Sequence, residues 1–115
     1  MGFTPSYKVG VEFINEPYRS VIRGLRDALI SVWGDNLVSL VVFGSVARGD
    51  ARRDSDVDLL IVGKQLPKSR FKRLELFEEA ERLVESLVES LWSQGYYIDF
   101  TPIILDVEEA VKGLK

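Results

Sequence analysis

The sequence contains no cysteine and no histidine. Without cysteine, disulfides, thiolate nucleophiles and cysteine-ligated metals are excluded, and nothing in the composition requires an oxidising compartment. Without histidine, the commonest general base, serine–histidine triads and most zinc sites are excluded as well. Any catalysis must therefore rest on carboxylates, hydroxyls, basic side chains or a hard metal ion bound by oxygen atoms.

Long apolar runs and an excess of charge of one sign are also missing. No run approaches the roughly 20 apolar residues that span a bilayer, and the N-terminus lacks the basic start and apolar stretch of a signal peptide. The net charge is −3 and charges of both signs are interspersed, which is unlike the basic footprint of proteins that bind nucleic acid through its phosphates. We therefore expect a cytoplasmic protein without a membrane partner or an extensive nucleic-acid surface.

The chain is long enough for one domain with a modest core. It has 115 residues, of which 46% are hydrophobic, and we expect a single domain over residues 1–115. Apolar residues at helical spacing predict a first helix that is capped by Asn15 and ends near Gly34. The same spacing predicts a long second helix over residues 71–92, whose apolar stripe belongs to the core.

Three β-rich runs predict strands at residues 38–43, 57–62 and 96–105. The nearly continuous apolar character of the first run is typical of a strand covered on both faces. Pro102 favours an edge position or a bulge for the third strand. Ser69 and Asp106 are candidate caps of the helices that follow them. The order of elements predicts an α/β (α+β) fold, a small mixed β-sheet backed by helices.

The most informative stretch is FGSVARGD at residues 43–50, followed by DSDVDL at residues 54–59. A glycine at a strand end allows a tight turn and a close approach to a ligand, and the N–H groups that follow favour phosphate oxygens. Ser45 adds a hydroxyl there, although Gly44-Ser45 alone is most often an ordinary turn. Gly44 and Gly49 have P-loop spacing, but the lysine and the hydroxyl residue that should follow are missing, so we reject a P-loop.

Asp56 and Asp58 are two residues apart, so on a strand both carboxylates point to one face. Their mutual repulsion is best offset by a divalent cation, and carboxylate oxygens suit Mg²⁺ or Mn²⁺ bridging the phosphates of a substrate. The alternative is a solvated acidic strand end. An EF-hand loop that starts at Asp54 is rejected, because its sixth position holds Leu59 instead of glycine.

Gly44-Ser45, ten intervening residues and Asp56-x-Asp58 together resemble the signature of the polymerase-β-like nucleotidyltransferase superfamily. Residues 43–62 are especially similar to its minimal (MNT) branch. This resemblance implies the nucleotidyltransferase fold and the transfer of a nucleoside monophosphate, with ATP as the implied donor, to an acceptor hydroxyl with release of pyrophosphate.

The resemblance also implies the residues of the site. Asp56 and Asp58 would hold two Mg²⁺ ions, with Mn²⁺ as a substitute, and Asp99 would complete the second metal site as the third catalytic carboxylate. Considered alone, Asp99 is equally well an edge-strand carboxylate in water. Gly44, Ser45 and Arg48 would bind the nucleotide. Taken one by one, Arg48, Arg52 and Arg53 are more often solvated loop cations.

Many members of the minimal branch resemble antitoxins paired with a HEPN-domain ribonuclease, which they modify on a tyrosine. The sequence ends within about ten residues of its third predicted strand, too few for a recognition domain, so we expect recognition by a HEPN-type partner. Two other classes stay open. One is a catalytically silent module that inhibits its partner by covering it, and the other is an interaction protein that dimerises through the stripe of the second helix. Retention of the carboxylates favours the enzyme.

Overall fold

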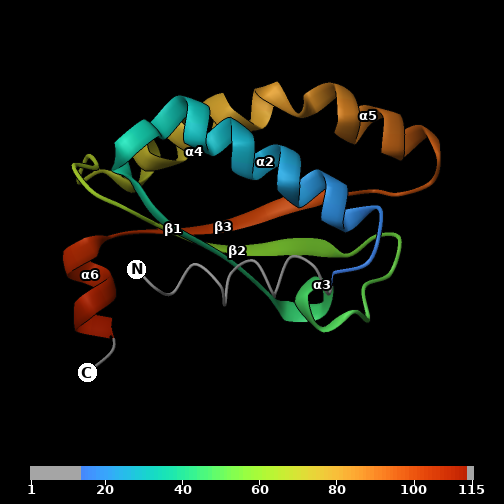
Figure 1. Cartoon of the computed structure of the whole chain (residues 1–115), viewed down its shortest axis with the longest axis horizontal. Coiled ribbons are helices and arrows are strands. Elements are labelled where there is room, and N and C mark those ends of the chain that lie inside the picture. The colour runs from blue at the N-terminus through green and yellow to red at the C-terminus, as the bar shows by residue number, and fades with distance from the viewer. Residues whose placement is uncertain (1–13, 114–115) are drawn as a thin grey trace.

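A three-stranded sheet organises residues 14–113, the part of the chain that the computed structural model describes (Figure 1). The elements in chain order are α2 (Tyr18–Trp33), the 3₁₀ turn η1 (Gly34–Asn36), β1 (Leu37–Phe43), α3 (Gly44–Arg48), β2 (Asp56–Gly63), α4 (Arg70–Leu83), α5 (Glu85–Ser93), β3 (Asp99–Asp106) and α6 (Val107–Gly113). The predicted α+β class is confirmed. No helix within residues 14–113 has both the length and the apolar character needed to cross a bilayer.

The sheet is mixed, as predicted. Its order is β1-β2-β3, with β1 antiparallel and β3 parallel to the central strand β2. A parallel neighbour requires a crossover connection, which α4 and α5 provide. Helices α2, α4 and α5 lie over one face of the sheet (Figure 1). Pro102 lies on β3, opposite Leu59, and this is the edge position predicted for it.

The core lies between that face and the helices. On β2, Val57, Leu59 and Ile61 are fully buried and alternate with more exposed residues. The prediction that the first strand is covered on both faces is wrong, because Val38, Val41 and Phe43 are 41%, 42% and 41% exposed. An apolar run does not distinguish one covered face from two.

Helix α2 ends at Trp33, immediately before Gly34, as predicted. The Trp33 indole N–H donates to the Leu76 carbonyl at 3.2 Å and ties α2 to α4. The prediction that Asn15 caps this helix is wrong. The Glu16 carboxylate instead accepts the backbone N–H of Ser20 at 3.1 Å, while the Asn15 amide donates to the carbonyl of Gly49.

The predicted long second helix is two helices. At Val84 the backbone leaves the helical region, with φ −108° and ψ 7°, which ends α4 before α5 begins. Val84, at the break, and Leu91 on α5 are buried, whereas Phe71 and Leu83 are 69% and 61% exposed. Part of the apolar stripe that we expected in the core therefore lies on the surface. Tertiary packing, and not the periodicity of the sequence, sets the path of this segment.

Both predicted caps after the second strand are confirmed. The Ser69 hydroxyl accepts the Lys72 N–H at 3.3 Å at the start of α4. The Asp106 carboxylate accepts the Glu109 N–H at 2.8 Å, and the Glu109 carboxylate accepts the Asp106 N–H at 2.9 Å. The two hydrogen bonds between Asp106 and Glu109 form a reciprocal capping box at the start of α6.

Arg73 is a buried cation, 4% exposed, that joins four segments. Its guanidinium donates to the Pro67 carbonyl at 2.7 Å and to the Glu109 carboxylate at 2.6 Å, and lies 3.5 Å from the Asp106 carboxylate. The linker before α4, the end of β3 and helix α6 thus meet on one side chain of α4. The backbone and side-chain acceptors compensate for the desolvation of the charge.

We expect Arg73→Ala to lower the free energy of unfolding by about 2–4 kcal/mol, because two carboxylates and two carbonyls lose their donor. Lys72→Ala is the matched control, since Lys72 is its exposed neighbour on α4. Urea denaturation of both variants measures the difference. Equal stability of the two variants would mean that the fold does not depend on the buried guanidinium.

Candidate active site

The antiparallel pairing of β1 with β2 brings the two halves of the sequence motif together. Phe43, the last residue of β1, is the register partner of Asp58 on β2, so the Gly44-Ser45 turn lies beside the aspartate pair. On β2, Val57 is buried whereas Asp56 is exposed and Asp58 half-buried. The predicted alternation is confirmed, and both aspartates face away from the helices.

Gly44 is required where it stands. Its φ is +80°, and a Cβ atom added to it would lie 2.2 Å from Oδ2 of Asp58. The carboxylate of Asp58 therefore packs directly against the backbone of the turn. Ser45 follows in the first turn of α3, and Val46 is buried with 1% exposure, which fixes this short helix against the core.

The third predicted carboxylate begins the edge strand. Asp99 is the register partner of Asp56 across the parallel pair, so the backbone brings Asp99 next to the aspartate pair. Its carboxylate accepts the N–H of Phe100 at 3.0 Å. Within residues 14–113, however, no three carboxylates lie close enough together to bind one metal ion. The structure thus brings the three positions together without converging their side chains.

The donor chemistry of Asp56 and Asp58 fits a hard divalent cation. Among the described residues, neither aspartate forms an ion pair with lysine or arginine. Two carboxylates on the same strand face are thus left without a neutralising cation, and Mg²⁺ or Mn²⁺ prefers oxygen ligands of this kind. Asp56 and Asp58 would supply two of the oxygen ligands of such a cation.

The three loop cations have different surroundings. Arg48 ends α3 and forms an exposed pair with Asp50 at 3.5 Å, a contact weak enough to exchange for a phosphate. The Arg53 guanidinium lies over the ring of Tyr96, 4.9 Å from its centroid. The backbone N–H of Arg52 donates to the Ser55 hydroxyl at 2.7 Å. Of these cations, Arg48 is the one whose contacts favour the predicted role in nucleotide binding.

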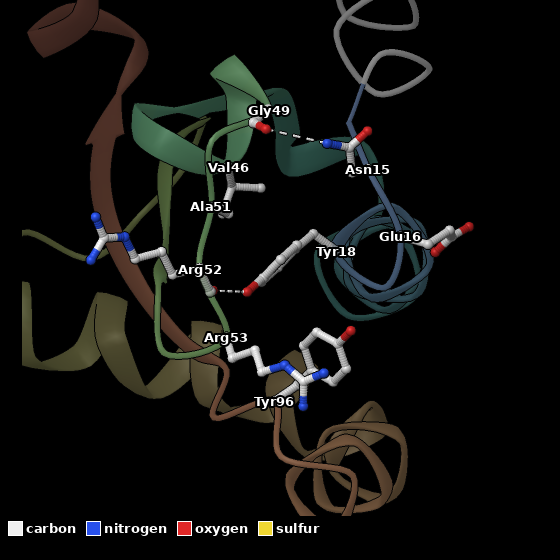
Figure 2. Close-up of a pocket in the computed structure, with 9 residues that line it drawn as sticks. All are labelled: Asn15, Glu16, Tyr18, Val46, Gly49, Ala51, Arg52, Arg53 and Tyr96. Atoms are coloured by element: carbon white, nitrogen blue, oxygen red, sulfur yellow. Dashed lines mark hydrogen bonds between the residues drawn. The ribbon is translucent and has the colours of Figure 1, made fainter.

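A cavity of about 270 Å³ lies behind α3 (Figure 2). Asn15 and Tyr18 reach across it from the start of α2, and the Tyr18 hydroxyl donates to the carbonyl of Arg52. Burial raises the pKa of Tyr18, and the charges of Tyr96 and Asp54 add to the effect. These contacts hold the loop that leads into Asp56. The sequence does not predict this contact with the loop, because Tyr18 belongs to the apolar stripe of α2 and resembles any other core residue of an amphipathic helix.

A second hollow, a groove of about 700 Å³, lies between α4, α5 and the start of β3, with Asp99 in its lining. Burial raises the pKa of Glu81 in this groove, and the negative charges of Asp99, Glu78 and Glu85 raise it further. Sequence reasoning missed these glutamates as part of a site, because the acidic side of an amphipathic helix normally faces water.

Comparison with known proteins identifies the family. The family model for the nucleotidyltransferase domain matches residues 22–110. The chain therefore belongs to the nucleotidyltransferase domain family, which confirms the resemblance drawn from residues 43–62. The matched region includes the Gly44-Ser45 turn and all three candidate carboxylates.

Three curated relatives bear related names. "Putative protein adenylyltransferase MJ1305" of Methanocaldococcus jannaschii is 38% identical over 64% of this chain and 45% of its own length. "Putative protein adenylyltransferase MJ0141" of the same organism is 31% identical over 73% and 75%. "Protein adenylyltransferase MntA" of Thermococcus cleftensis is 49% identical over 37% and 42%. The matches thus span less than half of MJ1305 and of MntA.

We expect Gly44→Ala to destabilise the protein more than Gly34→Ala. Both glycines have a positive φ, +80° and +56°, but nothing lies within 4 Å of a Cβ on Gly34. Each variant should lose about 1–3 kcal/mol to the strained backbone conformation, and Gly44→Ala should lose roughly 1–3 kcal/mol more, because Asp58 must move. Denaturant unfolding of both variants measures the gap, and equal losses would contradict the contact with Asp58.

Proposed function

We propose that this chain is a cytoplasmic Mg²⁺-dependent nucleotidyltransferase that moves AMP from ATP onto an acceptor hydroxyl, a tyrosine of a HEPN-type partner. Membership of the family and the names of the relatives support the class of reaction. The single observation that carries the proposal is the contact between the Asp58 carboxylate and the Gly44 turn. It joins a candidate phosphate site to a candidate metal ligand from two separate parts of the sequence.

The nucleotide would lie across this junction. The Gly44 turn and the Ser45 hydroxyl contact the β and γ phosphates, and Arg48 exchanges its pair with Asp50 for a phosphate oxygen. Asp56 and Asp58 hold the divalent cations, and Asp99 adds a carboxylate when its side chain turns toward its strand neighbour. The cations, once bound, supply charge neutralisation and lower the pKa of the acceptor hydroxyl.

The transfer is an in-line displacement at the α-phosphorus. The acceptor oxygen forms a bond to that phosphorus, the bond to the oxygen bridging the β-phosphorus breaks, and pyrophosphate leaves. The hydroxyl proton passes to a carboxylate, for which Asp99 is the candidate base. Asp99 starts the edge strand, so it lies at an open edge of the sheet that an acceptor can approach.

A second candidate function is a catalytically silent module that inhibits its partner by covering it. The exposed apolar side chains of α4 and α5, including Phe71, Leu83 and Trp92, favour a partner surface of this kind, whether or not transfer occurs. The two candidates differ in whether the partner gains mass, and in whether inhibition survives the loss of a carboxylate.

Asp56→Asn should lose most of the stabilisation that Mg²⁺ and ATP together give the wild type, because one ligand of the divalent cation becomes an amide. At a ligand concentration about 100 times Kd, that stabilisation is about 2.7 kcal/mol. Asp54→Asn is the control, since Asp54 is an exposed loop carboxylate two residues away. Thermal unfolding with and without Mg²⁺ and ATP measures the stabilisation in the wild type and in both variants. A wild type that does not respond to them would refute the nucleotide site.

Asp99→Asn should still bind Mg²⁺ and ATP but transfer AMP at least about 100-fold more slowly, because a general base contributes about that much or more.

With ATP and a HEPN-type partner, the wild type should add one AMP to a partner tyrosine, which intact-mass spectrometry detects. An unmodified partner that is still inhibited by wild type and by Asp56→Asn would favour the silent module. Equal rates for Asp99→Asn and wild type would remove Asp99 from the reaction.

A further inference from the structure

The groove beside Asp99 is built from three elements that are far apart in the sequence. Residues of α4 and α5 form one side, and the start of β3 closes the other, around a space of about 700 Å³. Its apolar surface comes from Val88, Trp92 and Ile98, and of these Ile98 is buried with 3% exposure. A floor of this kind binds the apolar parts of side chains, which a merely solvated acidic helix face does not.

The rim of the groove is strongly acidic. Glutamates at positions 78, 81, 85 and 89 line it together with Asp99, against a single arginine. The local charge is therefore more negative than the −3 of the whole chain. Glutamates four residues apart, such as Glu85 and Glu89, repel one another within one helix. A bound positive charge would offset that repulsion.

Trp92 forms an aromatic wall that is exposed and also fixed. Its side chain is 52% exposed, yet its indole N–H donates to the Ile98 carbonyl at 3.2 Å, and the Tyr97 ring packs against it edge-on at 5.5 Å. A ring held in this way contacts a ligand with little loss of side-chain entropy. Its face attracts the guanidinium or ammonium group of a ligand.

The groove leads to the candidate active site. Asp99 belongs to its lining and is also the register partner of Asp56. A chain that lies in the groove therefore reaches Asp99, at the strand start that pairs with Asp56. Nucleic acid does not fit the acidic rim, because its phosphates would be repelled along the whole length.

We propose that this groove binds a basic polypeptide segment of the acceptor protein and brings its hydroxyl to Asp99. The inference rests on the proposed transfer function and names the acceptor's chemistry: a hydroxyl side chain flanked by lysine or arginine. The cationic side chains pair with the glutamates of the rim, and one of them lies over Trp92. The hydroxyl next to them extends past Ile98 toward the strand ends.

The probe is a short synthetic peptide with one tyrosine flanked by lysine and arginine, and its counterpart carries glutamate at those positions. Binding is followed through tryptophan emission at low ionic strength. Trp33 is buried and Trp92 is exposed, so Trp92→Phe identifies the source of the signal. The basic peptide should change the emission of the wild type and the acidic peptide should not. Added salt should weaken the binding.

The matched variants reverse the same number of charges inside and outside the groove. Glu85 and Glu89 line the groove, whereas Glu75 and Glu79 are equally exposed acidic residues outside it. The double variant Glu85→Lys/Glu89→Lys should bind the basic peptide roughly tenfold more weakly or worse, whereas Glu75→Lys/Glu79→Lys should stay close to wild type. All four positions are on the surface, so both variants should fold, which circular dichroism checks.

With Mg²⁺ and ATP present, the bound basic peptide should gain one AMP by mass, and Glu85→Lys/Glu89→Lys should raise the peptide KM without abolishing the response to Mg²⁺ and ATP. Equal binding of both peptides, or equal losses in both double variants, overturns the inference. A dimer in sedimentation that Trp92→Ala dissociates also overturns it, because a second copy then occupies the groove. Peptide binding without any response to Mg²⁺ and ATP supports the groove as a basic-peptide site and refutes the transfer function.

Discussion

The candidate site depends on the antiparallel pairing of β1 with β2. That pairing sets Phe43 opposite Asp58, which places the Gly44 turn against a carboxylate fourteen positions further along the chain. The space between them is so small that a Cβ on residue 44 would lie 2.2 Å from Asp58 Oδ2. A shift of the register by one residue would turn both aspartates toward the core, where an unpaired carboxylate is costly.

The sequence predicts those parts of the fold that depend on local chemistry. The helix caps at Ser69 and Asp106, the end of α2 at Gly34 and the edge position of Pro102 all follow from the hydrogen-bonding or backbone properties of one residue. The break at Val84 and the exposed outer face of β1 do not, because they depend on which elements pack together. A run of apolar residues has the same spacing in the sequence whether its side chains are covered by another element or exposed to water, as Leu83 and Val41 show.

The same limit applies to the site. The period of a strand predicts that Asp56 and Asp58 share a face, and the strand after the second helix predicts where Asp99 lies. That Asp99 pairs with Asp56 follows only from the parallel crossover through α4 and α5. The groove was not predictable at all, since the glutamates around Glu81 become a lining only when the start of β3 packs beside them.

The departures from favourable local structure gather at one end of the sheet. Gly44 adopts a positive φ beside a carboxylate, burial and three neighbouring acids raise the pKa of Glu81, and Trp92 is half exposed. At the opposite end of the sheet, by contrast, Arg73 satisfies a buried charge with several acceptors. The exposed ring of Trp92 and the partly buried carboxylate of Glu81 are locally unfavourable, and neither is needed to close the core. Their common location, at the end of β1 and the starts of β2 and β3, coincides with the proposed site, and functional sites are where departures from locally favourable structure are expected.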